Sequence, residues 1–204
     1  LGITDPILSW DIPIPDEARA FAARMLPADK PVLAINPCTS NRSRNWRNWS
    51  VDNYAAVIEF ALEKLGMVTV LTGGSSKMEI DYADAIRQQS TAECIVGKTK
   101  LKELLAVLEQ ATVLISPDTG PAHMANAVGT PVIGLYASSN PNRTGPYNSL
   151  DISVNKYPEA IKGEFGKPVE EVRWGQRVRN PEVMSLIEFK DVRASLLSAI
   201  AKQA

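Results

Sequence analysis

The sequence has few of the residues that mark an exported or metal-binding protein. Its 204 residues include two cysteines, Cys38 and Cys94, and one histidine, His123. Two cysteines are too few for a disulfide framework and lack the spacing of metal ligands, so we expect a reducing compartment. No apolar stretch approaches 18 residues, and the N-terminal segment has acids and prolines where a signal peptide needs a basic end and an apolar centre. We therefore expect a cytoplasmic protein with no transmembrane segment.

An excess of either charge is also missing. The chain has 22 basic and 23 acidic residues and a net charge of -1. The protein as a whole then has no strong electrostatic field to attract nucleic acid or an acidic membrane. We therefore expect a local site to determine which ligands or partners bind. With 45% hydrophobic residues, the chain can bury a substantial core. Its first residue, Leu1, is not a methionine, which fits a processed product or a piece of a longer protein.

Short apolar runs alternate with amphipathic segments along the chain. The runs are rich in Val and Ile and are closed by Pro, Gly or a polar loop, which is typical of buried strands. They are residues 31–37, 67–73, 94–98, 111–117 and 131–136. Helices are predicted between them, over residues 50–66, 77–89, 100–111 and 120–129. This alternation predicts an α/β fold, a Rossmann-like parallel sheet with helices on both faces and ligands beyond the carboxyl ends of its strands.

The pattern divides the chain into a linker and one domain. Residues 1–15 are the expected linker segment, with two Ile-Pro pairs. Residues 16–204 are the expected Rossmann-like domain, which starts with a lead-in helix over 16–27 and closes with a helix over 185–203. The region 137–181 is rich in loops, and its role stays unassigned.

The stretch SPDTGPAHMANAVG follows one apolar run and opens a helix. Gly120 lets the backbone approach a ligand, and the helix N-terminus offers N–H groups and a partial positive charge to an anion such as phosphate. Thr119 and His123 can donate to phosphate oxygens. We assign Asp118 to orienting hydrogen-bond donors or to binding a sugar or ribose hydroxyl. The alternative is that Asp118 caps the helix and His123 is a packed surface residue.

A second loop, NPCTSNRSRNWRNWS, follows the first predicted strand. Thr39 and Ser40 are hydroxyl donors there. The arginines can form paired hydrogen bonds to phosphate oxygens, and the tryptophans can line an apolar pocket. These residues are Arg42, Arg44, Arg47, Trp46 and Trp49. Basic residues interleaved with tryptophans also suit single-stranded nucleic acid, but the balanced net charge argues against it. The alternative is a solvated basic loop with both tryptophans in the core.

Two further loops hold weaker candidates. Gly73 and Gly74 follow another predicted strand, but the sequence contains no G-x-G-x-x-G or Walker A pattern, so a tight turn explains them equally well. Glu79 can accept from ribose hydroxyls or can simply be solvated. Lys98 and Thr99 open a helix at the next strand end.

Together these motifs resemble the C-terminal half of the bacterial heptosyltransferases, the family 9 glycosyltransferases that use ADP-heptose to build the lipopolysaccharide inner core. SPDTGPAHMANAVGTPVIGLYASSNPNRTGPYN is similar to the family's Asp-(Ser/Thr)-Gly-x-x-His-x-Ala-x-Ala block, and INPCTSNRSRNWRNWSVDNYAAVI is similar to its early donor loop. The resemblance runs from about Ile12 to the end of the chain. It implies a GT-B fold of two Rossmann-like domains, of which this chain is the donor-binding half and from which the N-terminal acceptor domain is absent.

The resemblance also implies donor-binding residues. Arg44 stands where family members carry a lysine that contacts the diphosphate, and arginine keeps the charge but changes the geometry. Thr39 and Ser40 match the hydroxyl pair of that loop, Glu79 matches a ribose-binding glutamate, and Thr99 matches a position near adenine. The direct matches to donor contacts are Asp118, Thr119, Gly120 and His123. The family's late cysteines are absent from WGQRVRNPEVM, so that loop stays unassigned.

The implied function is inverting transfer of heptose from ADP-heptose to the lipopolysaccharide core, in the cytoplasm or peripherally at the inner face of the inner membrane. Arg44, Thr119 and His123 are expected to stabilise the departing diphosphate, so neither a metal nor another cofactor is required. The catalytic base is expected on the N-terminal domain, and this chain alone is expected to be inactive. The alternatives are a non-catalytic Rossmann-type nucleotide-binding module and a GT-B enzyme that uses a UDP-sugar.

Overall fold

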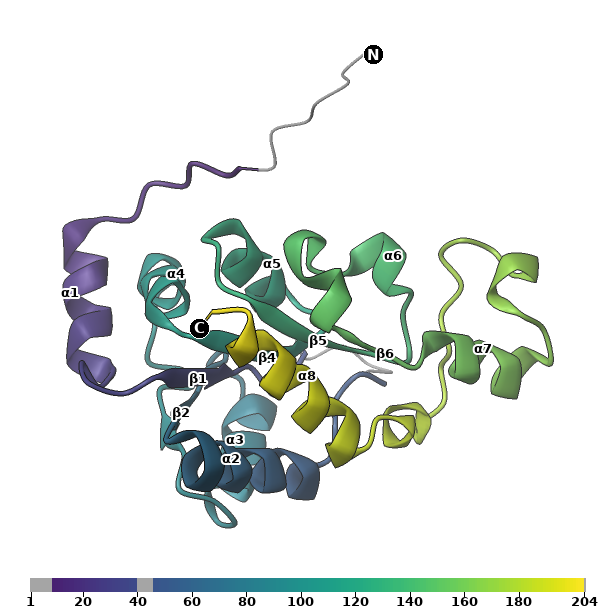
Figure 1. Ribbon diagram of the computed structural model, residues 1–204, viewed down its shortest axis with the longest axis horizontal. Coiled ribbons are helices and arrows are strands. Elements are labelled where there is room, and N and C mark those ends of the chain that lie inside the picture. Colours follow the sequence, from purple (N-terminus) through teal and green to yellow (C-terminus); the bar gives the residue numbers. More distant parts are fainter. Residues whose placement is uncertain (1–8, 40–45, 204) are drawn as a thin grey trace.

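The computed structural model describes residues 9–39 and 46–203. Within these ranges the chain forms a six-stranded parallel sheet in the order β3-β2-β1-β4-β5-β6, with helices on both faces (Figure 1). The strands are β1 (Val32–Ile35), β2 (Val68–Leu71), β3 (Glu93–Cys94), β4 (Val113–Pro117), β5 (Val132–Tyr136) and β6 (Val154–Asn155). The Rossmann-like α/β fold predicted from the sequence is therefore confirmed.

The order of the strands reverses between β1 and β4. On one side of β1, Ile35 pairs with Leu71 of β2, and on the other side it pairs with Ile115 of β4. All of these pairings are parallel, so the carboxyl ends of the three strands lie at one edge of the sheet. Loops that leave this edge on opposite sides of a reversal diverge, and the crevice between them is where such folds bind ligands.

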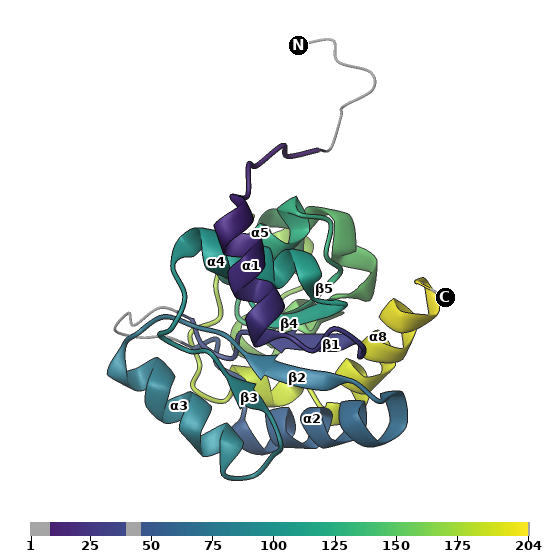
Figure 2. The same ribbon diagram turned by 90° about the vertical axis from the view of Figure 1, so that its left-hand side faces the viewer.

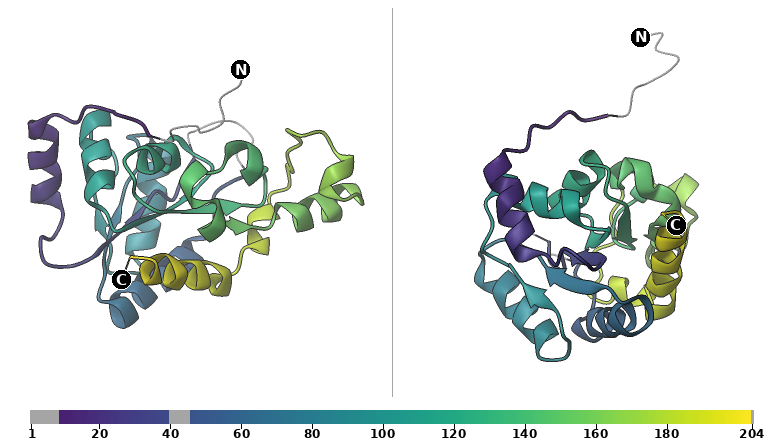
Figure 3. Two further views of the ribbon diagram at one scale, coloured as in Figure 1. Left: turned by 45° about the horizontal axis from the view of Figure 1, so that its top comes forward. Right: turned by 60° about the vertical axis from the view of Figure 1, so that its left-hand side comes forward.

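Two groups of helices cover the sheet, as Figure 2 shows. One face carries α1 (Asp16–Met25), α4 (Leu101–Gln110) and α5 (Gly120–Ala127). The other face carries α2 (Val51–Leu65), α3 (Lys77–Arg87) and α8 (Phe189–Ala201). The helix α1 lies alongside α4, also in both views of Figure 3. Among the residues that the structure describes, no helix is both long enough and apolar enough to cross a membrane.

Local sequence signals set the ends of the predicted helices. Ser50 accepts a hydrogen bond from the backbone N–H of Asn53 at 3.2 Å and so caps α2, as its position before the apolar pattern suggested. At the other end, Gly66 adopts a φ of 65°, a left-handed conformation that costs glycine little.

The structure differs from the sequence prediction at the edges of the sheet. The third strand is β3, Glu93–Cys94, whereas the prediction was residues 94–98, because the chain turns away at Gly97 with a φ of 73°. The loop-rich region after β5 contains β6, which pairs over only two residues and leaves no periodic pattern. That region also contains short helices: α6 (Pro141–Thr144), η1 (Tyr147–Ile152), α7 (Tyr157–Phe165), η2 (Val169–Glu171) and η3 (Val183–Leu186).

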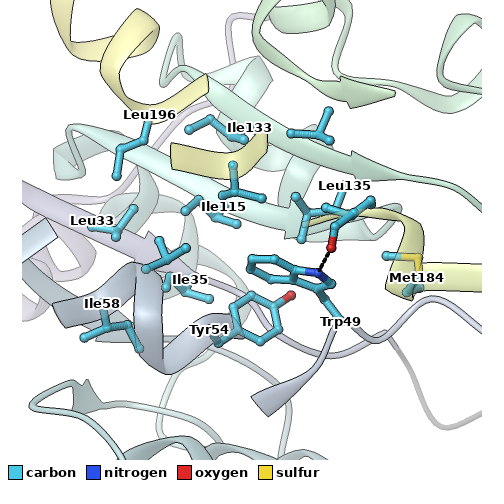
Figure 4. Close-up of a cluster of buried hydrophobic side chains, with 14 of the residues drawn as sticks. Leu33, Ile35, Trp49, Tyr54, Ile58, Ile115, Ile133, Leu135, Met184 and Leu196 are labelled. Carbon is cyan, nitrogen blue, oxygen red and sulfur yellow. Dashed lines mark hydrogen bonds between the residues drawn. The ribbon is translucent and has the colours of Figure 1, made fainter. Parts of the chain in front are cut away.

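Trp49 lies at the centre of the core beneath β1 and β4 (Figure 4). It is 1% exposed, its indole N–H donates to the carbonyl of Ile187 at 2.8 Å, and its ring meets Tyr54 edge to face at 5.1 Å. Trp46 is partly buried and packs against the same core. Trp49 is thus a core residue that joins the segment after β1 to the segment before α8. It is buried in the core rather than lining a ligand pocket.

We predict that Trp49→Phe lowers the free energy of unfolding by about 2–3 kcal/mol, because it removes ring volume and leaves the buried carbonyl of Ile187 without its donor. Urea unfolding followed by circular dichroism measures this change. The matched control is Trp10→Phe at a tryptophan that is 43% exposed, where we expect a change within about 0.5 kcal/mol. Equal losses in the two variants would contradict the central role of Trp49.

Candidate functional site

A cavity of about 460 Å³ opens at the carboxyl edge of the sheet, across the reversal between β1 and β4. We call it the switch-point cavity. The loops that follow β1, β2, β3 and β4 supply its walls. The lining residues are Asn36, Cys38, Thr39, Arg47, Gly73, Gly74, Glu79, Thr99, Lys100, Leu101, Leu104, Asp118, Thr119, Gly120, Pro121 and His123.

The structure brings most of the sequence-predicted site residues together in this cavity. Those that line it are Thr39, Glu79, Thr99, Asp118, Thr119, Gly120 and His123. They come from four different loops, and the parallel sheet places them at one edge. The two remaining candidates, Ser40 and Arg44, lie outside the described residues, as does Arg42.

A buried ion pair lies at the base of the cavity. A guanidinium N–H of Arg47 donates to the backbone carbonyl of Asp118 at 2.7 Å and lies 3.3 Å from its carboxylate. The two side chains are 15% and 9% exposed. The hydroxyl of Ser139 donates to the same carboxylate oxygen at 2.9 Å. Asp118 therefore holds one cation at the cavity wall, and its negative charge is compensated from two sides.

The N-terminus of α5 faces the cavity without a side-chain cap. Thr119 is the N-cap residue, but its hydroxyl lies 2.9 Å from that of Ser116 and accepts from no α5 N–H. Asp118 does not cap the helix either, which argues against the simple-cap alternative. A Cβ atom placed on Gly120 would meet nothing within 4 Å, so the space beside this backbone is open. Pro121 removes one N–H from the first turn.

Glu79 is fixed by its own loop. Its carboxylate accepts from the backbone N–H of Gly74 at 2.8 Å and from the hydroxyl of Ser76 at 2.6 Å. A Cβ atom on Gly74 would lie 2.9 Å from this carboxylate, so glycine there permits the close approach. Glu79 is half-buried and lines the cavity, rather than extending into solvent from the helix face.

The residues on either side of 40–45 are tied to each other. Asn48 accepts from the backbone N–H of Thr39 at 3.1 Å through its side-chain oxygen. Its amide nitrogen lies 3.7 Å from the sulfur of Cys38, and Asn36 donates to the carbonyl of Cys38 at 2.8 Å. Thr39 is almost fully buried. These contacts fix both ends of the early loop against β1.

Sequence reasoning missed some of the cavity wall. Lys100 lines the cavity, whereas Lys98, which the sequence pointed to, donates to the carbonyl of Cys94 at 3.0 Å. The signal for Lys100 was its place immediately before the first residue of α4, at the edge to which the strands point. In residues 9–39 and 46–203, no group of three or more His, Cys, Asp and Glu side chains could hold a metal ion.

Comparison with known proteins shows the family to which the chain belongs. The family model of glycosyltransferase family 9 (heptosyltransferase) matches residues 1–172. This chain belongs to that family. It is 34% identical, over 198 residues, to the lipopolysaccharide core heptosyltransferase OpsX of Haemophilus influenzae, covering 94% of this chain and 55% of OpsX.

Solved structures of related enzymes share the fold. ADP-heptose lipopolysaccharide heptosyltransferase II of Escherichia coli superposes with a TM-score of 0.71 at 17% identity, over 98% of this chain and 56% of that protein. Heptosyltransferase WaaC of E. coli with ADP superposes with a TM-score of 0.59 at 19% identity, over 89% of this chain and 48% of WaaC. This chain spans about half the length of the relatives that it matches.

The thiol of Cys38 gives a chemical test of the cavity wall. Burial, together with the nearby charge of Glu79, raises its pKa to about 12. At pH 8 the thiolate that attacks a disulfide reagent is then almost absent. We predict that a colorimetric aromatic disulfide modifies only the half-buried Cys94 of the folded chain, and both cysteines only after unfolding.

Cys94→Ser is the matched variant for this test. It should abolish the reaction of the folded chain at pH 8, and the remaining reaction should grow as the pH rises toward 12. Fast modification of Cys94→Ser at pH 8 would show that Cys38 is not buried in the cavity wall.

Proposed function

We propose that this chain is the donor-binding part of an inverting heptosyltransferase, which holds ADP-heptose in the switch-point cavity for transfer to the lipopolysaccharide inner core. The observation that carries the proposal is the convergence of Thr39, Glu79, Thr99 and the 118–123 segment on one cavity. The names of the relatives support it, since OpsX is a lipopolysaccharide core heptosyltransferase and WaaC was solved with ADP.

In this proposal the diphosphate lies against the N-terminus of α5. The open space beside Gly120 admits a phosphate close to the backbone, and the partial positive charge of the helix favours an anion there. Thr119 and His123 add donors from the cavity wall. Arg44, matched from the sequence, adds a guanidinium fork.

The nucleoside part then extends toward the loops after β2 and β3. The carboxylate of Glu79 is already oriented by Gly74 and Ser76, and it retains lone pairs that can accept from ribose hydroxyls. Thr99 lies at the adenine end in this arrangement. Because the carboxylate of Glu79 is held before binding, little entropy is lost in ordering it.

The proposed chemistry is a single displacement. An acceptor oxygen forms a bond to the anomeric carbon, the bond from that carbon to the diphosphate oxygen breaks, and the electron pair leaves with ADP. The acceptor proton goes to a base on the N-terminal domain of the two-domain enzyme. Arg44, Thr119, His123 and the α5 N-terminus meet the growing charge on the diphosphate, which is where such groups lower the barrier most.

The same function implies a domain organisation and a location for the enzyme. Residues 1–15 are a linker, and residues 16–204 are the nucleotide-sugar domain of a two-domain GT-B enzyme. The acceptor binds mainly through the N-terminal domain, so this chain alone is inactive. The enzyme works in the cytoplasm or peripherally at the inner face of the inner membrane, where its acceptor lies.

The first test is calorimetric titration of the 204-residue chain with ADP and, in parallel, with UDP, each with and without magnesium. We expect ADP to bind more tightly than UDP and magnesium to leave the affinity unchanged, because protein cations and N–H groups meet the diphosphate. Preference for UDP would indicate a transferase with another donor, and no binding by a folded chain would remove the site assignment.

Variants of the site residues test whether ADP binds in the switch-point cavity. We predict that Asp118→Asn weakens ADP binding about tenfold, ~1.4 kcal/mol, because Arg47 loses its anchoring charge. Arg44→Ala and Asp118→Ala should also weaken it while the fold stays intact, as judged by the melting temperature. The control is Asp84→Asn, which removes an exposed carboxylate that pairs with Arg87 at 3.6 Å. Unchanged affinity in the site variants would refute the assignment.

A further inference from the structure

A second cleft, of about 790 Å³, shares no lining residue with the switch-point cavity. We call it the arginine cleft. Its walls are Arg143 of α6, Glu164 and Phe165 of α7, and residues 173–177 and Arg179 of the loop that follows. The helices α6 and α7 lie toward the same end of the molecule (Figures 1 and 3). This is the late loop that the sequence analysis left unassigned.

The cleft concentrates positive charge. Four guanidinium groups line it, those of Arg143, Arg173, Arg177 and Arg179, against the single carboxylate of Glu164. In the part of the chain that the structure describes, no carboxylate lies within ion-pair distance of these four. Like charges that converge in a concave site repel one another and focus the field into it, so the site favours an anionic ligand.

The backbone that carries these arginines is anchored. Val178 is 1% exposed, its N–H donates to the carbonyl of Ser138 at 3.0 Å, and its carbonyl accepts from the Ser138 hydroxyl at 2.7 Å. The carbonyl of Gln176 accepts from the hydroxyl of Tyr157 at 2.7 Å. The backbone on both sides of Arg177 is therefore fixed before any ligand binds, which lowers the entropic cost of binding.

Gly175 makes room for one of the cations. A Cβ atom at this position would lie 2.6 Å from a terminal nitrogen of Arg143. The guanidinium from α6 therefore packs directly on the backbone of the late loop, and any larger residue would displace it. Two segments that are separate in sequence are thus joined at the floor of the cleft.

Trp174 gives the cleft an apolar surface beside its charges. Its side chain is 62% exposed, an unusual exposure for the largest aromatic residue. The flat face of an indole packs against the C–H face of a sugar ring, while arginine forks bind phosphate or carboxylate groups in two-point geometry. A concave site is poorly shaped for a flat lipid surface. The combination fits an anionic saccharide.

We propose that the arginine cleft binds a saccharide that carries two or more phosphate or carboxylate groups. This step rests on the proposed function, under which such a saccharide is the anionic part of the acceptor glycan. The backbone supports this placement: Ser138 anchors the arginine loop, and its neighbour Ser139 donates to Asp118 in the switch-point cavity. The two sites are therefore connected through adjacent residues that follow β5.

Fructose 1,6-bisphosphate is a suitable probe, titrated calorimetrically into the full chain with and without saturating ADP. We expect binding in both conditions, and at least about tenfold weaker binding of fructose and of inorganic phosphate, because each lacks part of the contact. The double variant Arg177→Gln/Arg179→Gln should weaken the bisphosphate about tenfold or more. The control Arg24→Gln/Arg87→Gln removes the same charge from exposed helix positions and should have no effect.

Trp174→Ala tests the contribution of the indole ring separately from that of the arginines. It should weaken the bisphosphate several-fold and leave inorganic phosphate unchanged, since phosphate alone does not use the ring. Equal losses in the arginine double variant and its control, or no bisphosphate binding at all, would overturn the proposal. Binding of phosphatidylglycerol vesicles in place of the bisphosphate would overturn it in favour of a lipid surface.

The two proposals fail separately in this experiment. Bisphosphate binding without ADP binding would refute the proposed donor site and leave the arginine cleft standing as a saccharide site. ADP binding without bisphosphate binding would refute the arginine cleft alone. Melting temperatures of all variants show whether a loss of binding reflects a loss of fold.

Discussion

The ion pair between Arg47 and Asp118 is the contact on which the switch-point cavity depends. It joins the loop after β1 to the end of β4, the two strands between which the sheet order reverses, and Ser139 adds the end of β5. Both side chains are mostly buried, so neither charge is well compensated by water if its partner is lost. Asp118 beside an anionic ligand would otherwise repel it. Arg47 neutralises that charge, which is what the proposed diphosphate site requires of this wall.

Periodicity and strand-end position were enough to predict the fold and to point to several residues that line the switch-point cavity. The segment around Asp118 and Gly120 was identifiable because polar and glycine residues stood where a buried strand ends, and parallel strands end at one edge. The partners of these residues were not predictable. Arg47 lies 71 positions from Asp118 and Trp49 lies 138 positions from Ile187, and no local pattern encodes such separations. For the same reason, the two-residue pairing of β6 and the convergence of the late arginines emerged only from the three-dimensional arrangement.

The near-zero net charge and the cationic cleft are compatible because charge acts locally. A net charge of -1 removes long-range attraction for polyanions at physiological ionic strength. It says nothing about a concave site where four guanidiniums converge, as they do around Gly175. The same holds for the switch-point cavity, where Lys100 and Arg47 stand among neutral residues and two anchored carboxylates. The balanced composition therefore argues against a general nucleic-acid surface and is compatible with local anion sites.

Ser138 and Ser139 link these two sites through adjacent positions of the backbone. Ser138 is hydrogen-bonded twice to Val178, between two of the cleft arginines, and Ser139 is hydrogen-bonded to the carboxylate that holds Arg47. Both serines are buried, so each hydroxyl needs its partner and a shift of one backbone segment disturbs both contacts. The backbone of the late loop is therefore held by the segment that also carries Ser139. The segment after β5 therefore supports one wall of the switch-point cavity and the backbone of the arginine cleft at the same time.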